Sequence, residues 1–277
     1  MNFTTQTLKD ALNELANAGK VFSNESQFQF DLAWQLKEMG FEVELEVLSA
    51  NCSLADFINL SKEERMKYYT DIIVKDDENN YIAIELKYKT PGIKGIMCYT
   101  AVNGAKYYVA PQGAENISAY LYWKDVERLE HLIGGKIPLN FDNSKKVGKG
   151  YAVLLTNDEK YWGSNISQAS LAKEFLPLYE NKVVRNESLC WWVKYNKITN
   201  KVLDGRQKSS AMGYKRIETE DDAKSLCKKK IREHYPIKIS GTYKCTWLPY
   251  GKFNCSISGN NKKIYADEFK YLILEIK

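Results

Sequence analysis

Apolar residues recur at helical spacing in two segments near the N-terminus, residues 4–18 and 24–39. The stripe of the first segment consists of Leu8, Ala11, Leu12 and Leu15. The stripe of the second consists of Phe28, Leu32, Leu36 and Met39. Each pattern predicts an amphipathic helix that ends at a glycine, Gly19 or Gly40. Glu25 lies one turn before the second stripe, so we expect this acid at the N-terminal end of the buried helix face.

Alternating and continuous apolar runs predict strands after the second helix. Residues 41–48 alternate between apolar and acidic side chains, which is the period of a strand with one exposed face. Residues 71–75 and 81–88 are rich in Ile, Val and Leu, and the polar segment 76–80 between them predicts a hairpin. Residues 53–69 have no clear period and are predicted to form a helix or a loop.

A second hairpin, a third helix and a buried strand follow. Apolar runs flank Asn103-Gly104, a pair typical of a tight hairpin turn. Residues 117–133 carry a helical stripe that is expected to face inward and consists of Leu121, Val126, Leu129 and Leu132. The apolar run 151–155 predicts a central strand. The remaining predicted elements are a helix over 169–179, a strand over 189–193, a basic helix over 221–234, and strands within 237–258 and 268–276.

Charged side chains interrupt the hairpin strands at matching positions. Asp71 begins the first strand, and the second reads Tyr81-Ile-Ala-Ile-Glu-Leu-Lys87. Because successive strand side chains point to opposite faces, Glu85 and Lys87 share the face of Ala83. Buried charges are costly unless they are compensated. A divalent cation held by Asp71 and Glu85, with Lys87 beside it, would compensate them.

The Glu-x-Lys pattern alone carries little information, because it occurs again at Glu268–Lys270 and Glu275–Lys277. Only Glu85–Lys87 has an acid at the start of a neighbouring strand, and no Asp or Glu occurs between residues 233 and 267. The two later copies are typical of charged positions on a solvated or edge strand. A plain surface role for Asp71, Glu85 and Lys87 is the alternative, and the Ile, Val and Leu content of both strands argues against it.

Glu25 on a preceding helix, Asp71, and Glu85-Leu86-Lys87 together resemble the motif of the PD-(D/E)XK, or restriction-endonuclease-like, nuclease superfamily. The resemblance covers roughly residues 20–165. It departs at the first acid, where Thr70 stands in place of the proline. The predicted order of helix, hairpin strands, helix and strand is also the order of that nuclease core.

The fold implied by this resemblance is α/β, with a restriction-endonuclease-like mixed central sheet flanked by helices. The nuclease-like core would occupy residues 20–165, and residues 166–277 would form a basic, mixed α/β elaboration that is rich in strands. No proline- or glycine-rich linker separates the two parts, so we expect a single domain over residues 1–277.

The resemblance also implies a metal-dependent mechanism. Asp71 and Glu85 would hold Mg²⁺, with Mn²⁺ as a substitute, and the Leu86 carbonyl would be a further ligand. The ion would lower the pKa of a bound water, and Lys87 would orient that water or stabilise the developing charge. Glu25 would hold a second ion or an outer-shell water.

The net charge of +5 is unevenly distributed along the chain. Residues 1–138 contain 14 Lys and Arg against 20 Asp and Glu, and residues 139–277 contain 26 against 15. An acidic half for metal and a basic half for phosphate suit a nuclease. The candidate phosphate-binding residues are Lys89, Lys145, Lys146, Lys149, Lys228, Lys229 and Lys230. An ordinary solvated surface is the alternative explanation for them.

Other classes of protein are disfavoured. Six cysteines without a Cys-x-x-Cys pair and only two histidines argue against a zinc site and indicate free thiols. The N-terminus lacks a basic segment followed by an apolar one, and no apolar run approaches the roughly 20 residues of a membrane span. We therefore expect a cytoplasmic protein that does not contact a membrane.

The expected activity is metal-dependent endonucleolytic cleavage of DNA, with duplex DNA as the substrate, in restriction, defence or repair. Duplex cleavage in the superfamily often requires a dimer, which makes a homodimer an open expectation. The alternatives are a non-catalytic nucleic-acid-binding protein that keeps the nuclease fold, and a hydrolase acting on RNA or a nucleotide. Lys87 favours turnover, because binding alone needs no lysine beside a metal pair.

Overall fold

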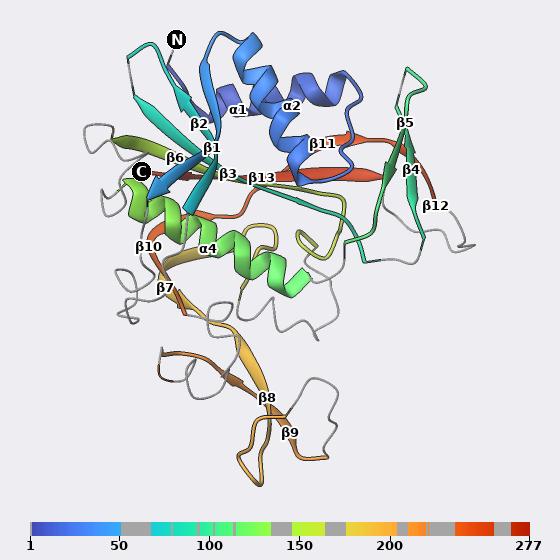
Figure 1. The fold of residues 1–277 in the computed structure, drawn as a ribbon. Helices are drawn as coiled ribbons and strands as arrows, with labels where there is room; N and C mark the ends of the chain where they lie inside the picture. Colours follow the sequence, from blue (N-terminus) through green and yellow to red (C-terminus); the bar gives the residue numbers. More distant parts are fainter. Residues whose placement is uncertain are drawn as a thin grey trace.

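A computed structural model describes most of the chain. The described residues are 2–50, 68–78, 80–92, 95–101, 103–112, 115–133, 146–163, 176–203, 210–219, 221, 236–257 and 267–277. Within them, a six-stranded mixed sheet lies between helices, so the protein is α/β as predicted (Figure 1). Of the helices in these ranges, none is long and apolar enough to cross a membrane.

The central sheet combines strands from both ends of the chain. In spatial order its strands are β1 (Glu42–Ala50), β2 (Tyr68–Lys75), β3 (Tyr81–Lys89), β6 (Val147–Thr156), β13 (Glu268–Ile276) and β11 (Trp247–Lys252). The pair β3–β6 is parallel, and the other neighbours are antiparallel. The C-terminal part of the chain therefore completes the same sheet that carries the predicted acids.

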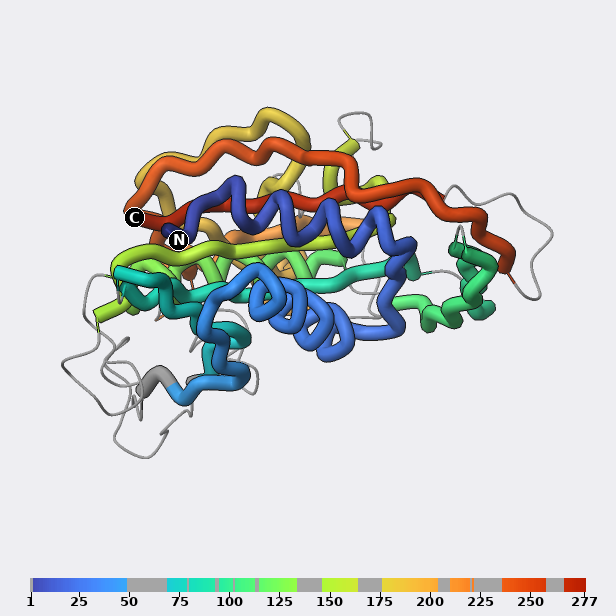
Figure 2. Tube along the Cα trace, turned by 90° about the horizontal axis from the view of Figure 1, so that it is seen from above, coloured from blue at the N-terminus to red at the C-terminus, as the bar shows by residue number. Residues whose placement is uncertain are grey.

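Helices cover both faces of this sheet. On one face lie α1 (Thr5–Asn17) and α2 (Glu25–Glu38), and on the other lies α4 (Glu115–Ile133) (Figures 1 and 2). The side chains of Thr4 and Asn24 cap α1 and α2 by accepting backbone N–H bonds. Two separate apolar cores result, one between the sheet and α1–α2 and one between the sheet and α4.

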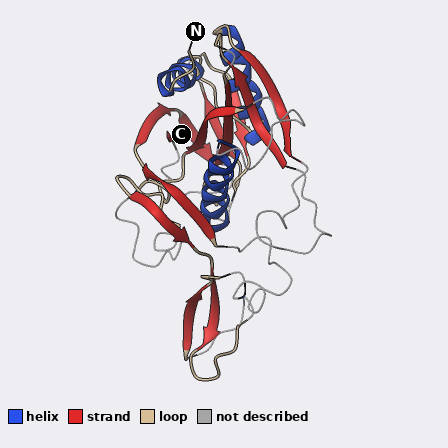
Figure 3. Ribbon diagram, turned by 90° about the vertical axis from the view of Figure 1, so that its left-hand side faces the viewer, coloured by secondary structure: helices blue, strands red, loops and turns tan. Residues whose placement is uncertain are grey.

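Smaller sheets extend from this body. One consists of β12 (Asn254–Ile257), β4 (Met97–Thr100) and β5 (Lys106–Val109). A second pairs β7 (Val183–Leu189) with β10 (Ile237–Lys244), and a third pairs β8 (Trp192–Asn196) with β9 (Met212–Arg216). The β8–β9 pair points away from the rest of the molecule (Figures 1 and 3).

Most of the predicted elements are confirmed, because long periodic segments are also the buried ones. Two predictions are wrong. Leu121 is 38% exposed, because Tyr120, Tyr122 and Trp123 fill the inner face of α4 at that turn, whereas the rest of the predicted stripe, Val126, Leu129 and Leu132, is buried. The predicted strand 189–193 is in fact the junction between β7 and β8.

Most of the segments 53–69, 169–179 and 221–234 lies outside the described residues, and residues 176–179 are not helical. The alternation predicted over 41–48 is confirmed only in part. Phe41 packs in the α1–α2 core, whereas Val47 belongs to the α4 core, and Glu46 between them has a left-handed φ of 50°.

Candidate functional site

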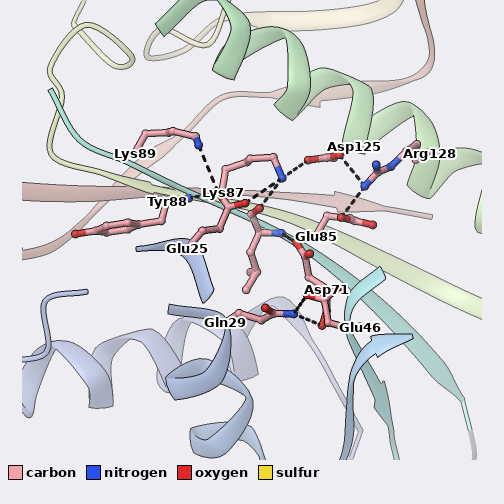
Figure 4. Close-up of polar contacts among 11 residues, drawn as sticks. Glu25, Gln29, Glu46, Asp71, Glu85, Lys87, Tyr88, Lys89, Asp125 and Arg128 are labelled. Carbon is pink, nitrogen blue, oxygen red and sulfur yellow. Dashed lines mark hydrogen bonds and ion pairs between the residues drawn. The ribbon is translucent and has the colours of Figure 1, made fainter. Parts of the chain in front are cut away.

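The strands β2 and β3 stop pairing in the middle of the sheet. Their backbone ladder ends at Ile72 opposite Ile84, and carboxylates then take the place of β2 along the edge of β3. The Leu86 N–H donates to Asp71 Oδ2 over 2.7 Å, and the Tyr88 N–H donates to Glu25 Oε2 over 3.0 Å (Figure 4). We call this opening, bounded by Asp71, Glu25 and residues 85–89 of β3, the fork.

Gln29 fixes the β2 side of the fork. Its amide donates to the Asp71 carbonyl over 2.7 Å and to Glu46 Oε1 over 2.9 Å (Figure 4). Gln29 is buried, and it lies on α2 one turn after Glu25. The same helix therefore supplies both an acid of the fork and the amide that holds β2 at the point where it separates from β3.

The helix α4 supplies charged partners to β3 from the opposite face. Glu85 Oε2 lies 2.8 Å from Arg128 Nη2, and Lys87 Nζ lies 2.8 Å from Asp125 Oδ2. Asp125 Oδ1 and Arg128 Nη2 are also 2.8 Å apart, which closes the chain of ion pairs. The side chains of Glu85 and Asp125 are only 1% and 5% exposed. The compensation that the sequence assigned to a cation is thus supplied in part by α4.

Lys87 also faces the fork. Its Nζ donates to the Leu86 carbonyl over 2.8 Å and lies 3.7 Å from Glu25 Oε1. Burial lowers the pKa of Lys87, but the carboxylates of Asp125, Glu25 and Asp71 outweigh burial and raise it overall. Lys87 therefore remains an ammonium group near neutral pH and can act as a hydrogen-bond donor and a point charge.

Burial is the largest cause of the pKa shifts of the two predicted metal ligands. It raises the pKa of Asp71 to about 6, although Lys87 and the Leu86 N–H favour the ionised form. Burial also raises the pKa of Glu85 well above its ordinary value, with Arg128 opposing and the charges of Asp125 and Asp71 adding to the increase. Both acids thus lack full compensation of their charge, even with Arg128 and Lys87 in place.

The residues of the fork fit a hard divalent cation by their chemistry. Asp71 and Glu85 offer carboxylate oxygens, the kind of donor that Mg²⁺ and Mn²⁺ take. Glu85 and the Leu86 carbonyl are bonded to Arg128 and Lys87, so a cation would have to take over these oxygens. In the described ranges, no group of three or more His, Cys, Asp or Glu side chains is arranged to hold a metal ion.

The predicted phosphate-binding lysines are dispersed. Lys89 joins the fork, with its Nζ 3.6 Å from Glu25 Oε2. Lys149 lies near the other end of the sheet, where its Nζ is 3.9 Å from Glu275 and that acid also accepts a bond from Thr5 of α1. Lys146 is exposed just before β6. The others, Lys145, Lys228, Lys229 and Lys230, lie outside the described residues.

Three residues of the site were not predicted: Gln29, Asp125 and Arg128. The spacing of Asp125 and Arg128 is i,i+3, which is a common surface pair on a helix. The useful signal is that their helix also carries a wide apolar face, so a charged pair at its edge can reach the sheet. Comparison with protein-family models, with curated proteins and with solved structures finds no match for this chain.

Proposed function

We propose that this protein is a metal-dependent nuclease of the restriction-endonuclease-like, PD-(D/E)XK kind, which hydrolyses phosphodiester bonds of DNA. The observation that carries the proposal is the fork. The buried acid Glu85, the half-buried acid Asp71 and Lys87 meet where neighbouring strands separate, and Glu25 joins them from α2.

The order of elements supports the same proposal. The chain runs through α2, the antiparallel strands β1, β2 and β3, then α4, and then β6 parallel to β3. This is the order that the resemblance to the nuclease core implies. This agreement supports the interpretation that the fold brings the motif residues together to form a site.

Each residue has a role in the proposed reaction. Asp71 and Glu85, with the Leu86 carbonyl, would hold Mg²⁺ or Mn²⁺, which would supply a more acidic water and charge neutralisation at the phosphate. Lys87, kept protonated by its acidic neighbours, would donate to the attacking water or to a phosphate oxygen. Glu25 holds the Tyr88 amide and the ammonium groups of β3 in position.

A second candidate function is supported by the ion pairs of α4. Arg128 pairs with Glu85, and Asp125 pairs with Lys87. These contacts compensate part of the charge of β3 within the chain, as a non-catalytic nucleic-acid-binding protein that keeps the fold would do. The two candidate functions differ in whether the protein cleaves the nucleic acid that it binds.

Incubation with supercoiled plasmid in Mg²⁺, in Mn²⁺ and in chelator tests the choice. The wild type should nick or cut the plasmid only when Mg²⁺ or Mn²⁺ is present. Asp71→Asn and Lys87→Ala should each lower the rate of cutting by about 100-fold or more. Lys75→Ala is the matched control, because Lys75 is a β2 lysine paired with Glu42 outside the fork. Equal nicking by all four proteins would indicate contamination, and no cutting by any would leave the non-catalytic candidate.

A further inference from the structure

The strands β8 and β9 form a ribbon that leaves the body of the protein (Figures 1 and 3). We define the β8–β9 ribbon as residues 192–203 and 210–216. We propose that this ribbon is an arm that contacts the phosphates of duplex DNA. The proposal rests on the proposed nuclease function and adds the surface that binds its substrate.

The shape of the ribbon suits insertion or tracking along a groove. Lys194 pairs with Tyr214 and Val193 pairs with Lys215 in an antiparallel register, so cations occur on both faces. Every residue of β9 except Gly213 is exposed, and Ile198 beyond β8 is 83% exposed. Two strands spaced about 4.8 Å apart fit the roughly 12 Å width of the major groove of B-DNA.

The charge of the ribbon has one sign. Its cationic residues are Lys194, Lys197, Lys201, Lys215 and Arg216. Residues 192–203 and 210–216 contain no Asp or Glu, and Asp204, which directly follows the first of these segments, lies outside the described residues. The nearest acid along the chain among those described is Glu218, whose Oε1 is 4.0 Å from Arg216. An excess of cations on an exposed surface is the electrostatic feature by which proteins bind phosphate backbones.

Aromatic side chains accompany these cations. Tyr214 is 42% exposed, and Tyr195 and Lys197 lie over Gly213, where a Cβ would come within 3.0 Å of the Tyr195 ring and 2.7 Å of Lys197 Cε. Side chains larger than hydrogen at position 213 would displace both. Tyrosines and lysines close together on an exposed surface suit contact with sugars and phosphates.

The base of the ribbon is connected to the fork through α4. The Ile217 N–H donates to the Trp191 carbonyl over 2.9 Å, and the Trp191 ring packs edge-on against Tyr120 of α4, with centroids 5.6 Å apart. The same helix carries Asp125 and Arg128, which reach the fork. DNA held by the ribbon is therefore held by an element packed on the helix that borders the candidate active site.

Binding of a short fluorescent duplex, measured by anisotropy in chelator over a range of salt, tests the proposal. The variant is Lys194→Gln/Lys215→Gln/Arg216→Gln. The matched control, Lys9→Gln/Lys37→Gln/Lys252→Gln, removes the same charge from α1, from the end of α2 remote from Glu25, and from β11. Circular dichroism melts and hydrolysis of a small chromogenic phosphodiester in Mn²⁺ verify that the variant is folded and its fork intact.

The ribbon variant should bind at least about tenfold more weakly than the wild type near 0.1 M salt. Its slope of log K against log salt should be smaller by about 2.7, which is about 0.9 for each lost phosphate contact. Between about 50 and 200 mM salt the wild type should therefore lose about 40-fold more affinity than the variant. The control should follow the wild type.

Three outcomes would overturn the proposal. Equal affinity and slope for the ribbon variant and the wild type would do so, as would the absence of DNA binding by the wild type. Tighter binding to an RNA duplex than to DNA would also do so, because the deep, narrow major groove of RNA excludes a ribbon. DNA binding that needs the ribbon, without hydrolysis of plasmid or small diester, would support the arm and refute the nuclease.

Discussion

Replacement of Arg128 by glutamine would leave two buried carboxylates without the cation that they share. Arg128 Nη2 lies 2.8 Å from both Glu85 and Asp125, whose side chains are 1% and 5% exposed. Loss of one partner of a fully buried ion pair costs about 3–5 kcal/mol. Because Arg128 is itself 28% exposed and Lys87 still pairs with Asp125, we expect Arg128→Gln to lower the free energy of unfolding by about 2–3 kcal/mol.

The effect has a predicted pH dependence. Burial raises the pKa of Glu85, and removal of Arg128 would raise it further. A raised carboxyl pKa means that the native state binds a proton that the unfolded state has released, so stability falls as pH rises through that window. The deficit of Arg128→Gln should therefore grow as the pH rises and shrink as the pH falls.

Thermal melts in chelator measure this deficit. For a chain of this size, about 2–3 kcal/mol corresponds to a fall in Tm of roughly 5–10 °C. Glu85→Gln and the double variant Glu85→Gln/Arg128→Gln complete a double-mutant cycle, which should show a coupling of at least about 1 kcal/mol. A wild-type Tm for Arg128→Gln at about pH 8, or an additive cycle, would refute the description of the site as an ion-pair network.

Two further predictions concern the acids of the fork. Asp71→Asn should stabilise the metal-free protein by about 1–3 kcal/mol near pH 8 and by less near pH 5, because the pKa of Asp71 is raised to about 6. A variant that is as stable as the wild type or less stable in urea melts would contradict this prediction. Glu25→Gln should change stability by less than about 1 kcal/mol, since the amide oxygen of glutamine can still accept the Tyr88 N–H. Glu25→Ala loses this acceptor and should cost about 1–3 kcal/mol. Equal costs for the two variants in the same melts would show that this hydrogen bond is not important.

The parts of the fold that could be predicted are those written in local patterns. The stripe of α2 placed Glu25 at the N-terminal end of its buried face, where the acid accepts the Tyr88 N–H. The period-two pattern of β3 placed Glu85 and Lys87 on one face, and both contact α4 there. Such predictions succeed because the period of a buried element directly reflects which side chains face the core.

The parts that could not be predicted depend on packing between distant segments. Arg128 follows Glu85 by 43 residues, and only the packing of α4 on the sheet brings the two together. Similarly, an apolar run at residues 268–276 predicts a strand but not its place beside β6. The error at Leu121 arose because aromatic side chains occupy the inner face at that turn of the helix, whereas Val126, Leu129 and Leu132 further along are buried.

Binding of Mn²⁺ to the purified protein, measured by calorimetry near neutral pH, tests most directly whether the fork holds a divalent cation. Asp71→Asn should bind at least about tenfold more weakly than the wild type, because it loses a charged oxygen ligand. Glu42→Gln should bind like the wild type, because Glu42 is a 76% exposed acid on β1 that pairs with Lys75 outside the fork. No binding by the wild type, or equal binding by all three proteins, would contradict the account.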